Sequence, residues 1–162
     1  MKRLYMLLVA MFLLALLGCS GLQMDAAKSS QRFIVGKGAE ENCVTDTRTG
    51  LMWARNENLG YGDWFWAMDT IARLNNSYFC DHKNWRLPTR SELRTLINRS
   101  QPSTAHWLNT QGFTNVQAGY FWTSDTRGVG SGEAWIVSLL DGLETYFPYG
   151  NYYHVLPVRK IR

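Results

Sequence analysis

The sequence has few of the residues that usually carry enzyme chemistry or bind metal ions. Its three histidines, His82, His106 and His154, are far apart, and its three cysteines form no C-x-x-C pair. The strings G-x-S-x-G and H-E-x-x-H, the Walker phosphate-binding loop and the Asp-x-Asp-x-Asp-Gly calcium loop are all missing. We therefore predict a protein that is not an enzyme and that holds no cofactor or metal ion.

Only one long hydrophobic run is present, and it lies at the amino terminus. Lys2 and Arg3 precede an uncharged apolar segment, residues 4–17, which ends in L-L-G-C with the cysteine at position 19. The run is shorter than the roughly 20 residues that a membrane-spanning helix needs. A basic start, an apolar stretch and a small residue before the cleavage point are typical of a secretory signal.

The L-L-G-C string resembles the bacterial lipobox, whose cysteine receives diacylglycerol and, after cleavage, a further acyl chain such as palmitate. The resemblance implies a signal peptide at residues 1–18 and lipidation of Cys19. Ser20 resembles the residue that permits sorting to the outer membrane, so we expect an exported protein anchored there. Several acyl chains would hold it firmly, since each buried methylene contributes about 0.8 kcal/mol. An uncleaved anchor with a buried Cys19 is the alternative.

Excess charge of one sign is also missing from the mature chain. The sequence has 17 Lys and Arg against 13 Asp and Glu, and Lys2 and Arg3 leave with the signal. The remaining 15 basic residues give a net charge of only about +2, which favours no general attraction to polyanions. Because the chain is also expected to be exported, we predict no nucleic-acid partner.

Two cysteines remain if Cys19 carries lipid. Cys43 and Cys80 are expected to reach an oxidising compartment, where they most simply form one disulfide. Two buried thiols, or a redox or metal-binding pair, are the alternatives.

The rest of the chain divides into a tether, residues 19–31, and one α+β domain, residues 32–162. Asp63 is predicted to cap a helix that begins at Trp64 and stops at 75–77. Thr89 and Glu92 form a capping box for a second helix, and Asp141-Gly142 predicts a hairpin. Residues 98–118 are predicted to be mainly loops. The expected strands are residues 33–35, 43–45, 51–53, 120–123, 134–140, 143–146 and 154–159.

Three strings in this order resemble the family of the C-terminal domain of the Legionella collagen-like adhesin. They are V-T-D-T-R-T-G-L-M-W at 44–53, N-W-R-L-P-T-R-S-E-L at 84–93 and V-L-P-V-R at 155–159, with Y-F-W-T-S and A-W between the last two. The family is similar to C-type lectin-like domains. The resemblance therefore implies two helices around a small twisted antiparallel sheet, with terminal strands that pair with each other.

The resemblance implies adhesion, but it assigns no binding residue. The adhesin's domain is associated with sulfated polysaccharides, through basic residues outside the signature strings. The E-P-N, Q-P-D and W-N-D strings of calcium-dependent lectins do not occur. The collagen-like stalk is also missing, so stalk-driven trimerisation does not carry over. We expect the signature strings to serve the fold, with Arg86 held by a carboxylate or by carbonyls and the core built on Trp53, Trp85, Trp122 and Trp135.

Ligand binding is expected in the irregular segments 100–132 and 147–154, as in other lectin-like folds. Arg90 and Arg94 could bind a sulfate or carboxylate, although a solvated helix face also explains them. The tyrosine-rich loop suits recognition, or it covers a sheet edge. The candidates in these two segments are Trp107, Arg127, Tyr149, Asn151, Tyr152 and Tyr153.

Two functions remain open from the sequence. The first is a membrane-anchored lipoprotein that presents a non-catalytic domain for glycans or sulfated polysaccharide in adhesion. The second is an accessory lipoprotein that docks on an envelope assembly through protein–protein contacts. The predicted partners are thus the membrane, through the lipid, and a glycan or an envelope protein.

Overall fold

The computed structural model describes residues 31–55 and 59–161. The part of the chain from Phe33 onward makes up one structural unit. The predicted signal peptide 1–18, Cys19 and all of the predicted tether except Gln31 lie outside the described residues. None of the helices in the described ranges has the length and apolar character to cross a membrane.

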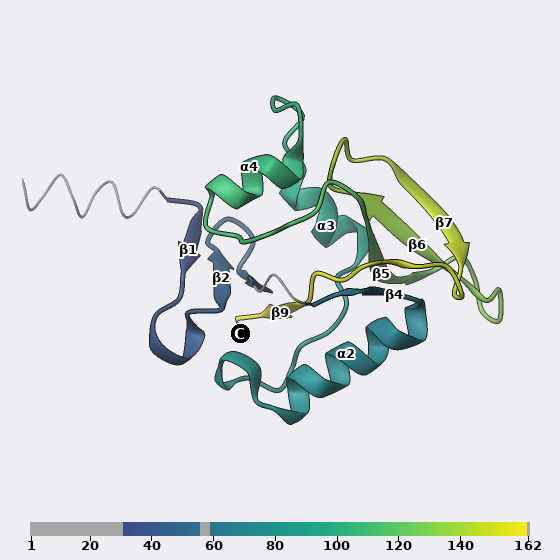
Figure 1. Ribbon diagram of the computed structural model, residues 1–162, viewed down its shortest axis with the longest axis horizontal. Coiled ribbons are helices and arrows are strands. Elements are labelled where there is room, and N and C mark those ends of the chain that lie inside the picture. Colours follow the sequence, from purple (N-terminus) through teal and green to yellow (C-terminus); the bar gives the residue numbers. More distant parts are fainter. Residues whose placement is uncertain (1–30, 56–58, 162) are drawn as a thin grey trace, which may run out of the picture. The chain divides into compact units, whose positions relative to one another are not determined.

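The first sheet contains both the first and the last strand of the domain. Its order is β1-β2-β3-β9, and each neighbouring pair is antiparallel. A turn joins β2 to β3, in which Asp46 accepts from the Arg48 backbone N–H at 3.1 Å and Gly50 has a φ of +68°. Figure 1 shows β1 and β2 side by side. The strands are β1 (Phe33–Val35), β2 (Cys43–Asp46), β3 (Leu51–Ala54) and β9 (Val158–Lys160).

The second sheet has the order β4-β8-β5-β6-β7, and only β5 and β8 are parallel. The Asp141-Gly142 turn joins β6 to β7 as predicted, with a φ of +81° at Gly142. The first strand of this hairpin ends at Ser138, not at residue 140, because residues 139–142 form the turn. Figure 1 shows β5, β6 and β7 together. The strands are β4 (Tyr61–Gly62), β5 (Tyr120–Thr126), β6 (Glu133–Ser138), β7 (Glu144–Pro148) and β8 (Tyr153–His154).

Both predicted helix starts are confirmed. α2 (Trp64–Asn76) begins after Asp63, whose carboxylate accepts from the Trp66 backbone N–H at 2.7 Å. α3 (Arg90–Leu96) begins after Thr89, and the complete capping box with Glu92 is present. These caps satisfy backbone N–H groups that have no partner inside the helix.

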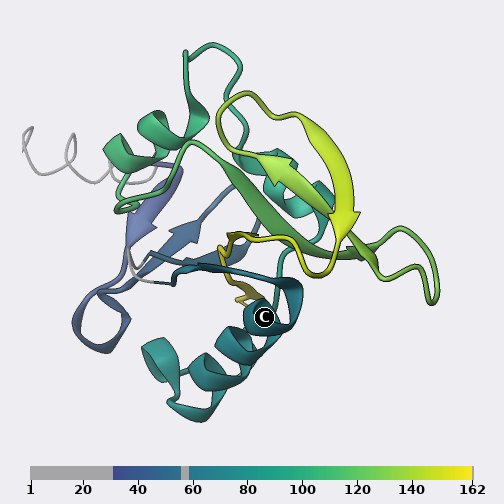
Figure 2. The ribbon, with the colours of Figure 1, turned by 45° about the vertical axis from the view of Figure 1, so that its right-hand side comes forward.

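A third helix, α4 (Thr104–Thr110), lies in the stretch that was predicted to be mainly loops, so that prediction was wrong there. Ser103 caps α4 by accepting from the His106 N–H at 3.3 Å. Only Thr104, Ala105 and Leu108 of this short helix are buried, so its apolar stripe is too narrow to show in the sequence. Figures 1 and 2 both show α2 and α4 on opposite sides of the strands.

The closing strand and the pairing of the terminal strands differ from expectation. Residues 154–159 were predicted to be one strand, but His154 ends β8 and Val158 begins β9, and these strands belong to different sheets. Pro157 lies between them and has no N–H for a ladder, while its carbonyl accepts from Ala54 at 2.9 Å. β1 and β9 are at opposite edges of their sheet and do not pair. The α+β class is confirmed, with two sheets instead of one.

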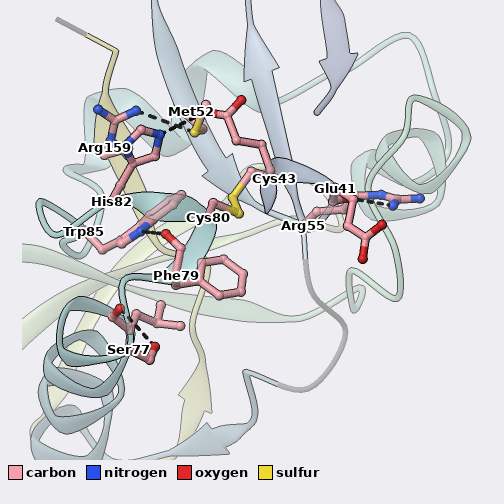
Figure 3. The surroundings of a disulfide bond; sticks show 12 residues. Glu41, Cys43, Met52, Arg55, Ser77, Phe79, Cys80, His82, Trp85 and Arg159 are labelled. Carbon is pink, nitrogen blue, oxygen red and sulfur yellow. Dashed lines mark hydrogen bonds and ion pairs between the residues drawn. A yellow bond between two sulfur atoms is a disulfide. The ribbon is translucent and has the colours of Figure 1, made fainter. Parts of the chain in front are cut away.

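Two buried clusters fill the domain, and the second contains the disulfide. Cys43 at the start of β2 is bonded to Cys80 in the 3₁₀ turn η2 (Phe79–Asp81), which confirms the predicted pairing. Figure 3 shows Trp85 and Phe79 beside this bond, and the Trp85 indole donates to the Phe79 carbonyl at 2.9 Å. Of the four tryptophans expected in the core, three are buried and Trp135 is only partly so. The buried ones are Trp53, Trp85 and Trp122.

Candidate ligand-binding site

Arg90 and Arg94 lie on α3 and face carboxylates of the second sheet. The Arg90 guanidinium is 3.9 Å from the centre of the Trp135 ring, a cation–π contact. Its nitrogens are also 3.7 Å from Asp125 and 3.8 Å from Glu144. Glu144 lies 3.3 Å from Arg94 as well. Both arginines are therefore engaged by acidic partners of the same domain.

Arg127 is arranged in the same way at the end of β5. It lies 2.9 Å from the Glu133 carboxylate and 4.2 Å above the Tyr146 ring. Tyr146 pairs across the strands with Trp135, and the two rings meet edge to face at 5.2 Å. Arg90, Trp135, Tyr146 and Arg127 thus form a continuous set, here called the arginine–aromatic row. No pattern in the sequence indicates this row, since the row depends on the register of β6 and β7.

Charges in and around this row balance. Three arginines, Arg90, Arg94 and Arg127, meet three carboxylates, Asp125, Glu133 and Glu144. An incoming sulfate would have to compete with these carboxylates for each guanidinium. The row therefore offers flat aromatic and guanidinium surface without a net positive charge.

Tyr149 supports the first turn of α2. Its ring stacks on Trp64 at 4.6 Å, with an interplanar angle of 18°, and Phe65 meets it edge to face at 5.7 Å. The Tyr149 carbonyl accepts from the Trp64 N–H at 2.9 Å. Tyr149 is half-buried, while Phe65 leaves 60% of its surface exposed. The exposed ring at this place is therefore Phe65, which was not among the binding residues predicted from the sequence.

Tyr153 belongs to the packing of the second cluster. Its ring contacts Trp122 at 4.9 Å and Phe147 at 5.7 Å. Burial raises the pKa of Tyr153, and a hydrogen bond with the Asn151 side chain opposes the rise. The phenol is thus held in place by its neighbours, and Asn151 supports it from the loop.

Trp107 lies elsewhere, on α4 beside the first cluster. Its ring meets Phe33 edge to face at 5.8 Å. Among the described residues, no ring contact joins Trp107 to the tyrosine loop. The structure therefore does not gather the predicted candidates into one site.

Tyr152 is the most exposed tyrosine of the loop, and its neighbour Tyr61 lines a cavity. Tyr152 leaves 56% of its surface exposed and faces Tyr61, which leaves 58% exposed, at a ring separation of 6.2 Å. Tyr61 in turn lies 5.0 Å from the His154 ring. Since both tyrosines project from the surface, they form an aromatic pair beside His154.

A cavity of about 230 Å³, here called the His154 pocket, opens between the two segments that were expected to bind ligands. Segment 100–132 contributes Thr114, Asn115, Gln117 and Phe121, and segment 147–154 contributes His154. The prediction named both segments but assigned neither this pocket nor its residues. Its apolar wall includes Phe121, Val155 and Leu156, and its polar groups are Arg55, Tyr61, Thr114, Asn115, Gln117 and His154.

His154 is placed in the pocket by its pairing with Tyr61 and by parallel pairing of β8 with β5 at Phe121. Burial lowers the pKa of His154, and a hydrogen bond with the Gly60 backbone opposes the shift only in part. The ring is therefore neutral at pH 7, with one donor and one acceptor nitrogen. Gly119 lies over its edge, where a Cβ atom would come within 3.3 Å of Nε2.

Metal ligation has no support in the described part of the chain, where no three His, Cys, Asp or Glu side chains gather to hold an ion. The polar groups of the pocket are mostly uncharged amides, hydroxyls and one imidazole. These groups suit hydrogen bonding to a polar, uncharged ligand.

Comparison with known proteins gives one assignment. No curated protein matches the chain. The family model of the Lcl C-terminal domain matches residues 42–159. This span holds both sheets except β1 and the last residue of β9, the three described α-helices and every described residue of the His154 pocket. The chain therefore belongs to the Lcl C-terminal domain family.

Proposed function

We propose that this chain is an exported lipoprotein whose domain recognises glycans in adhesion without catalysing a reaction. Membership of an adhesin-related family supports the proposal. The observation that carries it is the His154 pocket, an amphipathic cavity that adjoins two exposed tyrosine rings, Tyr61 and Tyr152.

The proposed recognition uses the two chemical faces of a sugar. The C–H face of a pyranose ring packs on aromatic rings, and Tyr61 and Tyr152 offer such rings beside the pocket. The sugar hydroxyls need donors and acceptors, which Asn115, Gln117 and His154 supply. Tyrosines combined with Asn and Gly side by side are typical of adaptable recognition surfaces.

We further propose that the domain is a variant of the C-type lectin-like fold that binds without calcium. The mostly antiparallel sheets, the capped helices and the irregular segments beside the pocket support this interpretation. The terminal strands share a sheet without pairing directly, and β3 lies between β2 and β9. Since the calcium-binding strings of lectins are missing from the sequence, a chelator should leave glycan binding unchanged.

Anchoring is proposed to depend on Cys19, with the outer membrane as destination. Cells that express the chain should incorporate labelled palmitate into it, and fractionation should place it with the outer membrane. Cys19→Ala should abolish the label and release the protein from membranes, whereas Cys43→Ala should leave the label intact. Label that persists in Cys19→Ala would contradict the anchor.

Glycan recognition is tested by an array of neutral, acidic and sulfated glycans. The full chain would be purified in mild detergent and applied first with calcium, then with a chelator. Binding that survives chelation supports the proposal. No binding by a folded protein would overturn it and would favour the accessory lipoprotein, which crosslinking to an envelope protein would then identify.

A further inference from the structure

We infer that the His154 pocket holds one uncharged pyranose ring at the end of a glycan chain, and that His154 accepts a hydrogen bond from a sugar hydroxyl. The inference rests on the proposed glycan recognition and names the sugar class and the residues that bind it. It follows from the size of the pocket, the chemistry of its walls and the surroundings of His154.

The size of the pocket restricts the ligand. Its volume of about 230 Å³ is below the roughly 300–1,000 Å³ of sites that enclose drug-sized molecules. It is also several times the roughly 30 Å³ that one water molecule occupies in the liquid. One sugar ring therefore suits this space better than an internal stretch of polymer, and the rest of the chain would lie outside.

The mostly uncharged polar groups in the described walls of the pocket suit an uncharged ring. Among the described residues that line the pocket, none is a carboxylate and Arg55 is the single charged one. Two of the five N–H groups of the Arg55 guanidinium donate to the backbone carbonyls of Gly112 and Glu41, which ties the guanidinium to the protein. At the rim, the Gln117 amide donates to the Asn115 backbone and side-chain oxygens at 2.9 and 2.7 Å, which holds the two amides together.

His154 supplies an acceptor at a defined place. Its hydrogen bond with the Gly60 backbone raises the pKa, so the ring acts as donor in that bond. In a neutral ring the other nitrogen is then an acceptor. At Gly119 there is no side chain to cover the Nε2 edge, where a Cβ atom would be 3.3 Å away.

Tyr61 extends the site beyond the first ring. It lines the pocket, contacts His154 at 5.0 Å and faces Tyr152 at 6.2 Å. A chain that leaves the pocket would thus pass over two exposed rings. This arrangement places the terminal residue inside and the next residue against the tyrosine pair.

The test is saturation-transfer NMR with methyl glycosides and the full chain in mild detergent. The probes are methyl glycosides of neutral hexoses, of an N-acetylated hexosamine and of a uronic acid. We expect transfer to at least one uncharged glycoside and weaker transfer to the uronic acid. Preference for the uronic acid would overturn the assignment of an uncharged ring.

Three variants locate the binding. Gly119→Ala adds one methyl against the Nε2 edge and should weaken binding at least tenfold. His154→Phe keeps a flat ring between Tyr61 and Phe121 but removes the acceptor, so a loss of about three- to tenfold is expected for one hydrogen bond. Gly128→Ala is the matched control, because its new Cβ meets nothing within 4 Å, and it should bind as the unchanged protein does.

The outcomes separate the two proposals. Array binding that is unchanged in both Gly119→Ala and His154→Phe would overturn the pocket assignment while glycan recognition stands. Absence of binding on the array for the unchanged chain would overturn glycan recognition itself. Thermal unfolding of each variant shows that the protein is folded, and the two pocket variants act independently, so misfolding of one does not decide the result.

Discussion

The guanidinium of Arg86 holds both oxygens of the Glu92 carboxylate, with Nη1–Oε2 and Nη2–Oε1 distances of 2.7 and 2.6 Å. The same carboxylate accepts from the Thr89 N–H at 2.8 Å and so completes the capping box of α3. The Arg86 backbone exchanges two hydrogen bonds with Val158 of β9, at 3.0 and 2.9 Å. One carboxylate therefore connects the start of α3 with the last strand, which confirms that a carboxylate holds Arg86.

Glu92→Gln should destabilise the domain. The substitution keeps the size of the side chain but removes the charge from the hydrogen bonds with Arg86 and Thr89. Hydrogen bonds to charged groups contribute about 1.5–3 kcal/mol, so we expect a free energy of unfolding lower by about 1–3 kcal/mol. Urea unfolding measures it, and Glu41→Gln, at an exposed position, is the control for the change in charge.

The Glu92 carboxylate also predicts that the stability of the domain depends on pH. Burial opposes ionisation of Glu92, but the hydrogen bonds from Arg86 and Thr89 outweigh it, so its pKa lies below the ordinary 4.5. A lowered carboxyl pKa contributes stability that is present above pH 4.5 and is lost as the pH falls through the folded-state value. Stability of Glu92→Gln should therefore fall less steeply below pH 4.5, and an equally steep fall would contradict this.

Removal of the disulfide should cost more stability than any single hydrogen bond. Cys43 and Cys80 are 37 residues apart, and the chain-entropy estimate for a loop of this length is about 4 kcal/mol. The double variant Cys43→Ala, Cys80→Ala should therefore unfold at a clearly lower temperature. A reducing agent should shift the unchanged protein toward the same value and leave the double variant unaffected, and equal stability of both proteins would contradict the prediction.

Glycoside binding should weaken in mild acid because of His154. Its folded-state pKa is below 6.5, since burial lowers it, and among the described residues the charged or titratable groups that share the pocket are Arg55 and Tyr61. Protonation removes the acceptor nitrogen, so binding should be constant above pH 7 and decrease as the pH falls through that pKa. The free energy of unfolding should decrease as the pH falls from the ordinary 6.5 to the lowered pKa, because the unfolded chain takes up the proton more readily.

Titration by NMR between pH 8 and 5 measures both effects. His154→Gln should make binding nearly independent of pH in this range, whereas His106→Gln, at an exposed position, should retain the full dependence. The Glu92 effect lies below pH 4.5, so the two intervals do not overlap. A binding curve for His154→Gln with the original midpoint would contradict the role of this residue.

Removing a carboxylate from the arginine–aromatic row should increase binding of sulfated glycans. Glu133 lies 2.9 Å from Arg127, which also stacks on Tyr146. Glu133→Gln leaves the stacking and frees the guanidinium, so affinity should rise about two- to fivefold, as expected from an exposed ion pair. The gain should disappear at high salt, and Glu41→Gln should show no comparable gain. A large loss from Arg127→Gln alone would show that this pairing does not mask the arginine.

Features that depend on neighbours in the chain were predicted correctly. Each of these features joins residues no more than three positions apart, so a short stretch of sequence is enough to predict it. They are the capping box of Thr89 and Glu92, the cap of α2 by Asp63 and the Asp141-Gly142 turn between β6 and β7. The disulfide was also predicted, on the expectation that Cys19 carries lipid and leaves Cys43 and Cys80 to pair. Family membership followed from strings that describe these same local features.

Features that depend on distant partners were not predictable. α4 was missed because its few buried residues matter only against the first cluster. The division of 154–159 depends on β5, which pairs with His154, and on β3, which pairs with Val158. The carboxylates that neutralise Arg90 and Arg94 come from the second sheet, so a helix in isolation shows only its arginines.

By itself, then, the sequence determined the helix caps, the hairpin turn, the cysteine pairing and the family. The tertiary structure alone decided which arginines are already engaged, which aromatic rings remain exposed and where a cavity opens. The His154 pocket needs Tyr61, segment 114–117 and His154 together, and these are brought side by side only when β4, β8 and β5 pair. Contacts between segments so far apart in the chain leave no local pattern, because their energy arises only after the sheet has formed.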